Sequence, residues 1–207
     1  MYLSHGNEKY AQLKMRAFTF GIPAGRSASG LRTCPGAKAC QAGCYAQQGR
    51  YFMTNVRRKQ EQRLKLTQSP EFVPTIVDEV KHLRAELVRI HDAGDFYRWS
   101  YLQDWIRIVG QCSTTEFLAY TKMIPFVLKA KPPKNLHLIC SYGGRWDRLI
   151  DPRRHQHTRI FSSVEDLEAA GYVDCHVTDL PALDPKNIKL GLVYHGFPTR
   201  RFTTGPK

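Results

Sequence analysis

Three cysteines crowd into a short segment of the chain, and their side chains are the ones best suited to chemistry. Cys34, Cys40 and Cys44 lie within eleven residues in a C-x5-C-x3-C pattern. A four-cysteine zinc ribbon would show paired C-x2-C knuckles, which the chain lacks. Three close thiolates suit an iron–sulfur cluster whose fourth iron is left for another ligand or a distant residue. The spacing therefore predicts a [4Fe-4S] cluster held by these three cysteines.

The residues between these cysteines favour this interpretation but leave others open. Small residues let the backbone curl closely around a bulky ligand and offer N–H groups to its sulfides. They are Gly36, Ala37, Ala39, Ala42 and Gly43. The alternatives are a zinc site completed by one of eight histidines, a redox dithiol, or cysteines buried as apolar residues. Cys140 and Cys175 are candidates for a fourth ligand, which would close the cluster and favour binding over catalysis.

Short apolar runs alternate with helical patterns along the chain, and these elements must position the cysteine loop. Strand-like runs cover 17–22, 87–91, 116–120, 136–140, 172–177 and 190–194. Helical patterns cover 54–68, 72–83, 99–109, a short segment up to residue 130, and 164–170. Strands that alternate with helices imply βαβ units and a parallel sheet, which right-handed crossovers curl into a complete or partial barrel.

We therefore predict an α/β fold, a partial or compact (β/α) barrel with mostly parallel strands, in one domain over residues 1–207. This domain includes the cysteine loop at 34–45 and ends in a basic C-terminal tail at 198–207. Polar or glycine-rich loops follow the predicted strands at 91–95, 121–122, 141–144 and 195–196, as the cysteine loop does. Such loops converge at one edge of a parallel sheet, where ligands bind. In the alternative interpretation they are ordinary turns, with Asp92 and Asp95 as helix N-caps.

The chain is strongly basic, with 31 Lys and Arg against 18 Asp and Glu and a formal net charge of +13. Such a surface attracts polyanions, so nucleic acid or a nucleotide is the expected partner, although basic residues also serve solubility alone. The candidate nucleic-acid-binding residues form two groups, which are Arg57, Arg58, Lys59 and Arg63, and Arg153 and Arg154. No run approaches the ~18 apolar residues of a membrane span, and the polar N-terminus lacks a signal core, so we expect a cytoplasmic protein.

Several blocks of the sequence resemble the phage-encoded Gene product 88 family. These are CPGAKACQAGCYAQQGRY at 34–51, RIHDAGDF at 89–96, AYTK at 119–122 and SYGG at 141–144. The resemblance covers about residues 17 to 147. It implies an organisation rather than an activity, and a phage-encoded protein would act in the host cytoplasm. Family members often carry another cysteine-rich stretch near the C-terminus, where this chain has only Cys175.

The layout is also similar to a compact version of the radical S-adenosylmethionine (SAM) enzymes. Those enzymes have a partial barrel, a three-cysteine loop after the first strand and an aromatic residue beside the last cysteine, and SAM chelates the fourth iron of their cluster. Tyr45 is consistent with this arrangement, although it follows Cys44 and the cysteine spacing is x5 and x3 where that family usually has x3 and x2. Likeness at this level is a fold analogy.

Carried over by residue, the radical SAM resemblance implies that Cys34, Cys40 and Cys44 ligate the cluster. It implies that Gly94 and Asp95 recognise the SAM amino group, that Ser141 and Gly143 meet its carboxylate or ribose, and that Lys122 neutralises an acidic group. The leading hypothesis is thus an iron–sulfur enzyme, radical SAM-like, that acts on nucleic acid or a nucleotide. The alternatives are a non-enzymatic iron–sulfur module or a zinc-stabilised module, which binds nucleic acid or a host protein.

Overall fold

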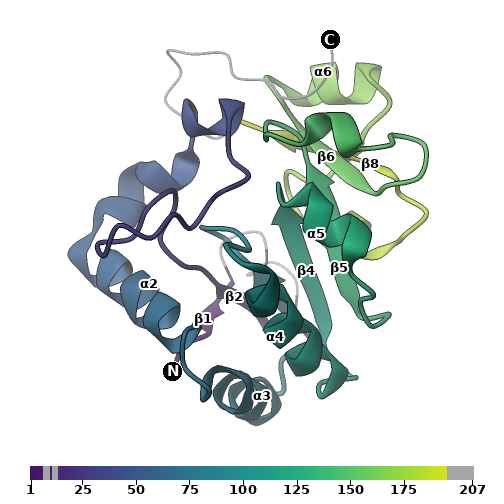
Figure 1. Ribbon diagram of the computed structural model, residues 1–207. Coiled ribbons are helices and arrows are strands. Elements are labelled where there is room, and N and C mark those ends of the chain that lie inside the picture. The colour runs from purple at the N-terminus through teal and green to yellow at the C-terminus, as the bar shows by residue number, and fades with distance from the viewer. Residues whose placement is uncertain (7–9, 11–13, 195–207) are drawn as a thin grey trace.

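The computed structural model describes residues 1–6, 10 and 14–194 and contains one eight-stranded sheet (Figure 1). The strands lie in the order β1-β2-β3-β4-β5-β6-β8-β7, and each pairs in parallel with its neighbour except β1, which is antiparallel to β2. Their bounds are β1 Ser4–His5, β2 Ala17–Phe20, β3 Leu87–Ile90, β4 Glu116–Thr121, β5 Leu136–Ser141, β6 His157–Phe161, β7 Val173–Asp174 and β8 Lys189–Val193.

α-Helices connect β2 to β3, β3 to β4, β4 to β5 and β6 to β7, whereas short 3₁₀ helices lie between β5 and β6 and between β7 and β8. The α-helices are α2 Thr54–Leu66, α3 Phe72–His82, α4 Trp99–Gly110, α5 Ile124–Lys129 and α6 Val164–Ala169. The structure confirms the α/β class and the mostly parallel sheet. β1 and β7 form its two edges, and no strand pairing joins them in the described part of the chain. A complete barrel is therefore not formed there, and curvature into a partial barrel stays a prediction.

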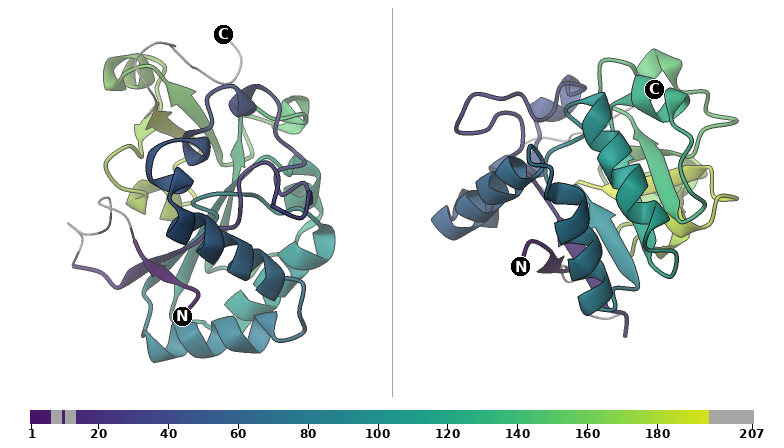
Figure 2. Two further views of the ribbon diagram at one scale, coloured as in Figure 1. Left: turned by 90° about the vertical axis from the view of Figure 1, so that its left-hand side faces the viewer. Right: turned by 60° about the horizontal axis from the view of Figure 1, so that its bottom comes forward.

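One face of the sheet packs against α2, α3 and α4, which lie together in Figures 1 and 2. Alternation along β2 directs Phe18 and Phe20 to this face and Ala17 to the other. Phe20 meets Trp105 of α4 edge to face at 5.2 Å, and Phe72 of α3 meets the same ring at 5.4 Å. The helix face thus holds the main hydrophobic core, which fixes the strands that carry the candidate site.

The opposite face of the sheet is covered by the chain itself. Its core includes Leu87, Leu118 and Ile139 from β3, β4 and β5. The buried side chain of Tyr10 and the short 3₁₀ helix η5, Leu180–Leu183, pack against these residues. Tyr10, which precedes β2, and η5, which follows β7, therefore cover part of this face of the sheet.

The structure differs from the sequence predictions mainly near the ends of the chain. β6 lies where the sequence predicts no strand, because His157 and Arg159 interrupt its apolar pattern. The expected strand at 172–177 is reduced to the two residues of β7. The loop at 195–196 and the tail at 198–207 lie outside the described residues. No helix in the described ranges is long and apolar enough to cross a membrane.

Candidate functional site

The cysteine loop docks on the carboxyl ends of β4 and β5 through backbone contacts that need glycine. The N–H of Cys40 donates to the carbonyl of Gly143 at 3.1 Å, and the N–H of Arg145 donates to the carbonyl of Gly36 at 2.8 Å. A Cβ on Gly36 would lie 2.6 Å from the carbonyl oxygen of Lys122, closer than real Cβ contacts come. The loop therefore packs so closely against the end of β4 that residue 36 has no room for a side chain.

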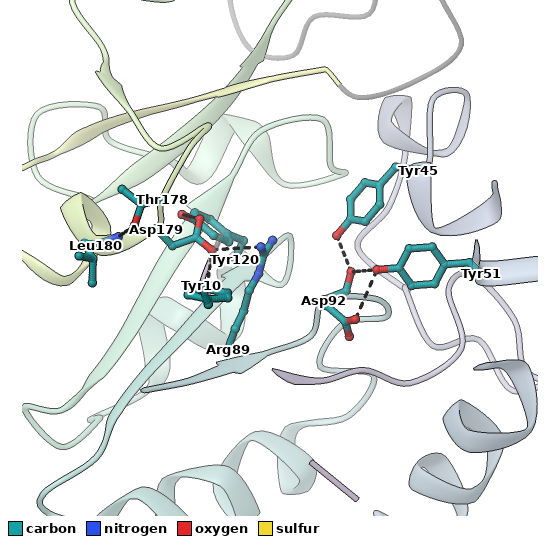
Figure 3. Close-up of polar contacts among 9 residues, drawn as sticks. All are labelled: Tyr10, Tyr45, Tyr51, Arg89, Asp92, Tyr120, Thr178, Asp179 and Leu180. Carbon is teal, nitrogen blue, oxygen red and sulfur yellow. Dashed lines mark hydrogen bonds and ion pairs between the residues drawn. The ribbon is translucent and has the colours of Figure 1, made fainter. Parts of the chain in front are cut away.

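Two tyrosines attach the far end of the same loop to the segment after β3. The hydroxyl of Tyr45 donates to the carbonyl oxygen of Asp92, and the hydroxyl of Tyr51 donates to the Asp92 carboxylate at 3.3 Å (Figure 3). The two rings meet edge to face with centroids 5.8 Å apart. Residues 34–51 thus span the sheet edge from the end of β3 to the end of β5.

Cys34, Cys40 and Cys44 are partly exposed, whereas Cys112, Cys140 and Cys175 are buried. The N–H of Gly25 donates to the Cys34 sulfur at 3.3 Å. Burial raises the pKa of the Cys34 thiol to about 12, and the charges of Asp95, Cys44 and Cys40 add to this shift. Burial also raises the pKa of Cys44, against the N–H groups of Ala46 and Gln47 and the charge of Lys122. The thiols of Cys34 and Cys44 are therefore protonated at neutral pH in the absence of a metal ion.

The three thiols share one loop without forming a ready-made metal site. In the ranges that the structure describes, no group of three His, Cys, Asp or Glu side chains is arranged to hold a metal ion. Cys140 packs in a hydrophobic cluster with Ile124 and Ile150, and Cys175 packs on the opposite face of the sheet with Leu190. The donor types and the N–H···S contact fit a cluster, but cluster binding requires the loop to bring its sulfurs together.

Asp95 joins the end of β3 to the end of β4. Its Oδ1 accepts from the Thr121 hydroxyl at 2.5 Å and from the Phe96 N–H at 2.7 Å, and its Oδ2 accepts from the Lys122 N–H at 2.9 Å. Burial raises the pKa of this carboxyl, and these donors oppose the shift. The alternative interpretation of Asp92 and Asp95 as helix N-caps is wrong, because α4 begins at Trp99 and Arg98 occupies its N-cap position.

The other residues implied by the radical SAM resemblance lie at the same edge, and the chain already uses most of their polar groups. The Lys122 ammonium donates to Ser141 Oγ at 2.8 Å. The N–H of Gly143 donates to the Asp147 carboxylate at 2.9 Å. Gly94 has φ of +84°, and a Cβ there would lie 2.3 Å from a side-chain carbon of Ile22. Gly94 therefore has a conformational and packing reason to be glycine without any ligand.

The two basic groups lie at different edges of the sheet. Arg57 and Arg58 are exposed on α2, whose first turn follows the cysteine loop. Arg153 and Arg154 precede the amino end of β6, and Arg153 lines a hollow with Lys186 and Lys189, which lie at the start of β8. Parallel strands place their amino ends opposite the edge that carries the cysteine loop. The structure thus does not bring the two groups into one surface.

Two of the basic residues on α2 hold the fold together. Arg63 is 4% exposed and donates to the carbonyl of Tyr2 at 2.5 Å and to Ser4 Oγ at 2.7 Å. The Lys59 ammonium donates to the same hydroxyl at 3.0 Å, and burial lowers the pKa of this amine. These side chains anchor the N-terminal segment to α2, so Arg57 and Arg58 are the members of this group that face solvent.

A family comparison agrees with this organisation of the chain. The family model of Gene product 88 matches residues 1–201. The chain belongs to the Gene product 88 family. The match extends beyond the blocks around the cysteine loop and takes in β6, α6 and β8. No curated protein and no solved structure is significantly similar to the chain, and none of these comparisons connects the family to the radical SAM enzymes.

Sequence reasoning missed a buried ion pair beside this edge. Arg89 lies in β3, and its Nη1 is 3.1 Å from Asp179 Oδ2. A charged residue between Val88 and Ile90, within an otherwise apolar strand, is the signal that marked it. A parallel strand in such a sheet is buried on both faces, so a charge there requires a partner.

The close approach at Gly36 gives the first prediction. Gly36→Ala places a methyl group against the Lys122 carbonyl, so we expect the cysteine loop to move away from the ends of β4 and β5. The thiols of Cys34, Cys40 and Cys44 should then react several-fold faster with a thiol reagent. The expected loss of stability is about 1–3 kcal/mol. Gly110→Ala is the control, because nothing lies within 4 Å of its Cβ position. Unchanged thiol reactivity in the Gly36 variant contradicts this account of the docked loop.

His91 gives a second prediction, on pH. Its Nε2 lies 2.9 Å from the Tyr101 hydroxyl, its φ is +64°, and burial lowers its pKa to about 3. In the unfolded chain His91 binds a proton below about pH 6.5, whereas in the folded chain it stays neutral down to about pH 3. The free energy of unfolding therefore has its full contribution from neutral His91 above about pH 6.5. Between these two pKa values it falls by about 1.4 kcal/mol for each unit that the pH is lowered.

We therefore expect His91→Asn to lack this component of the acid dependence, since asparagine tolerates positive φ. Urea unfolding at about pH 7 and about pH 4.5 measures it. The gap between the wild type and the variant should shrink at the lower pH, whereas exposed His5→Asn should follow the wild type at both. A constant gap between wild type and His91→Asn would show that His91 is not buried in its neutral form.

Proposed function

We propose that this member of the Gene product 88 family holds a [4Fe-4S] cluster through Cys34, Cys40 and Cys44. The proposal rests on one observation, the presence of three partly exposed thiols in a loop that is docked on the carboxyl edge of a parallel sheet. Ligands of parallel α/β proteins bind at that edge. The N–H donor on the Cys34 sulfur supports it, because hydrogen bonds to cysteine sulfurs tune such clusters.

The chain's own residues suit a negatively charged cluster. Thiolates are the ligating form of cysteine, and metal binding deprotonates the Cys34 and Cys44 thiols in spite of their raised pKa. The Lys122 charge favours thiolate at Cys44. When bound, the cluster supplies iron for electron transfer or for ligation of a further group. We propose SAM as the ligand of the open iron, next to Asp95, Lys122 and Ser141, and nucleic acid or a nucleotide as the substrate.

A non-enzymatic module is the second candidate, and the packing of the sheet favours it. Tyr10 and the η5 residues fill the face of the sheet opposite the helices, which leaves little room for a large substrate. In this alternative an iron–sulfur or zinc centre stabilises the loop, and the protein binds nucleic acid or a host protein. Metal content and the response to SAM separate the candidates, because only the enzyme requires an open iron.

Metal analysis of anaerobically purified protein tests the proposal. We expect about four irons and four sulfides per chain and, after reduction, an electron paramagnetic resonance signal that SAM perturbs. Cys40→Ala should lose the iron, whereas Cys112→Ala, which removes a buried thiol outside the loop, should retain it. Iron without a response to SAM indicates a closed cluster, and zinc without iron rules out the iron–sulfur proposal.

Nucleic-acid binding gives a separate prediction for α2. Arg58 is exposed, and Arg57 lies 4.6 Å over the exposed ring of Phe52, a pairing that suits a phosphate contact beside a stacked base. The double variant Arg57→Ala, Arg58→Ala should weaken binding to single-stranded DNA and reduce the slope of log K against log salt by about 1.4.

The matched control for this test is Arg153→Ala, Arg154→Ala, which removes the same charge from the other edge of the sheet. Fluorescence anisotropy at several salt concentrations provides the measurement. Equal losses in both double variants would show that the binding reflects net charge rather than the α2 surface.

A further inference from the structure

The ion pair of Arg89 and Asp179 is buried, and the Asp179 carboxylate is better supplied with hydrogen-bond partners than the Arg89 guanidinium. The side chains are 9% and 0% exposed. Asp179 accepts from the Tyr10 hydroxyl at one oxygen and from the Tyr120 hydroxyl at the other, at 3.0 Å, in addition to Arg89 (Figure 3). The carboxylate therefore has donors on both oxygens, and the two tyrosines satisfy it together with the arginine.

Arg89 is not satisfied in the same way. A guanidinium has five N–H donors, and the Nε of Arg89 is buried with no hydrogen-bond partner in the described part of the protein. Its other contacts are the ion pair with Asp179, a hydrogen bond with the Tyr10 hydroxyl and the Tyr120 ring, whose centroid lies 5.2 Å away. A buried donor without an acceptor destabilises a fold, so the Nε–H of Arg89 is a donor that an ordered water or a bound molecule can satisfy.

The guanidinium also lies toward the cysteine loop. In Figure 3 it stands between Asp179 on one side and the Tyr45–Asp92 contact on the other. Because Tyr45 follows Cys44 directly, Arg89 lies under the segment that carries the candidate metal ligands.

We propose that Arg89 binds the carboxylate of a small molecule at the carboxyl edge of the sheet, beneath the cysteine loop. A guanidinium matches the two oxygens of a carboxylate with parallel N–H donors. The Asp179 carboxylate contacts the same guanidinium, and its charge disfavours a dianionic phosphate more than a monoanionic carboxylate. The ligand thus belongs to the carboxylic acids or the amino acids. Metal plays no part in this contact, so it can hold whether or not the cluster proposal does.

The Nε–H of Arg89 reports on this contact directly, because arginine Nε–H groups give their own signals in ¹⁵N-correlated spectra. We expect sodium acetate, titrated into the full-length protein with sodium chloride removed in equal amount, to shift the Arg89 signal in a saturable way. The Nε–H of Arg63 is the internal control, since it already donates to the Tyr2 carbonyl and should not move.

Arg89→Lys identifies the signal and keeps a positive charge beside Asp179 while it removes the planar donors. Acetate should raise the melting temperature of the wild type, and this rise should be lost in the variant. If Arg89→Lys does not fold, sequential assignment of the wild-type spectrum identifies the Arg89 signal, and the titration of the wild type still decides the outcome. An Arg89 signal that ignores acetate overturns the proposal and leaves a structural ion pair, and a response to inorganic phosphate but not to acetate overturns the choice of carboxylate.

Discussion

The candidate site depends on the hydrogen bonds that the buried carboxylate of Asp95 accepts. This carboxylate binds the hydroxyl of Thr121 and the N–H of Lys122 at the end of β4, and the N–H of Asp95 itself donates to the carbonyl of Thr33 at the start of the cysteine loop. One buried residue thus joins the ends of two strands to the loop. Because its carboxylate accepts three hydrogen bonds in a buried position, each of these segments depends on the others for its place.

Lys122, which follows β4, contacts both the cysteine loop and the end of β5. Its backbone approaches Gly36 closely, and its side chain reaches Ser141 at the end of β5. The loop after β5 contacts the cysteine loop in turn, because the Gly143 carbonyl accepts a hydrogen bond from the Cys40 N–H. The cysteine loop is therefore held on both sides by groups that belong to different strands. This explains how a chain segment with only short 3₁₀ helices keeps a defined position.

The excess of positive charge serves two separate purposes. Arg63 and Arg89 lie inside the protein, where one ties the N-terminus to α2 and the other faces Asp179. Arg57 and Arg58 face solvent near the loop. Composition alone treats these side chains as one polyanion-binding surface. Burial separates them, because Arg63 and Arg89 direct their guanidinium groups to acceptors inside the protein, whereas Arg57 and Arg58 are accessible to a phosphate in solvent.

The sequence by itself determined the α/β class, the parallel strands and the gathering of polar loops at one edge, because apolar periodicity and the order of elements are local properties. It also marked the Gene product 88 blocks. It did not reveal β6, whose pairing with β5 and β8 overrides a basic and polar sequence. Only the tertiary structure decided that Asp95 holds strand ends together rather than capping a helix. The ion pair of Arg89 and Asp179 joins residues 90 positions apart, and no local pattern encodes that contact.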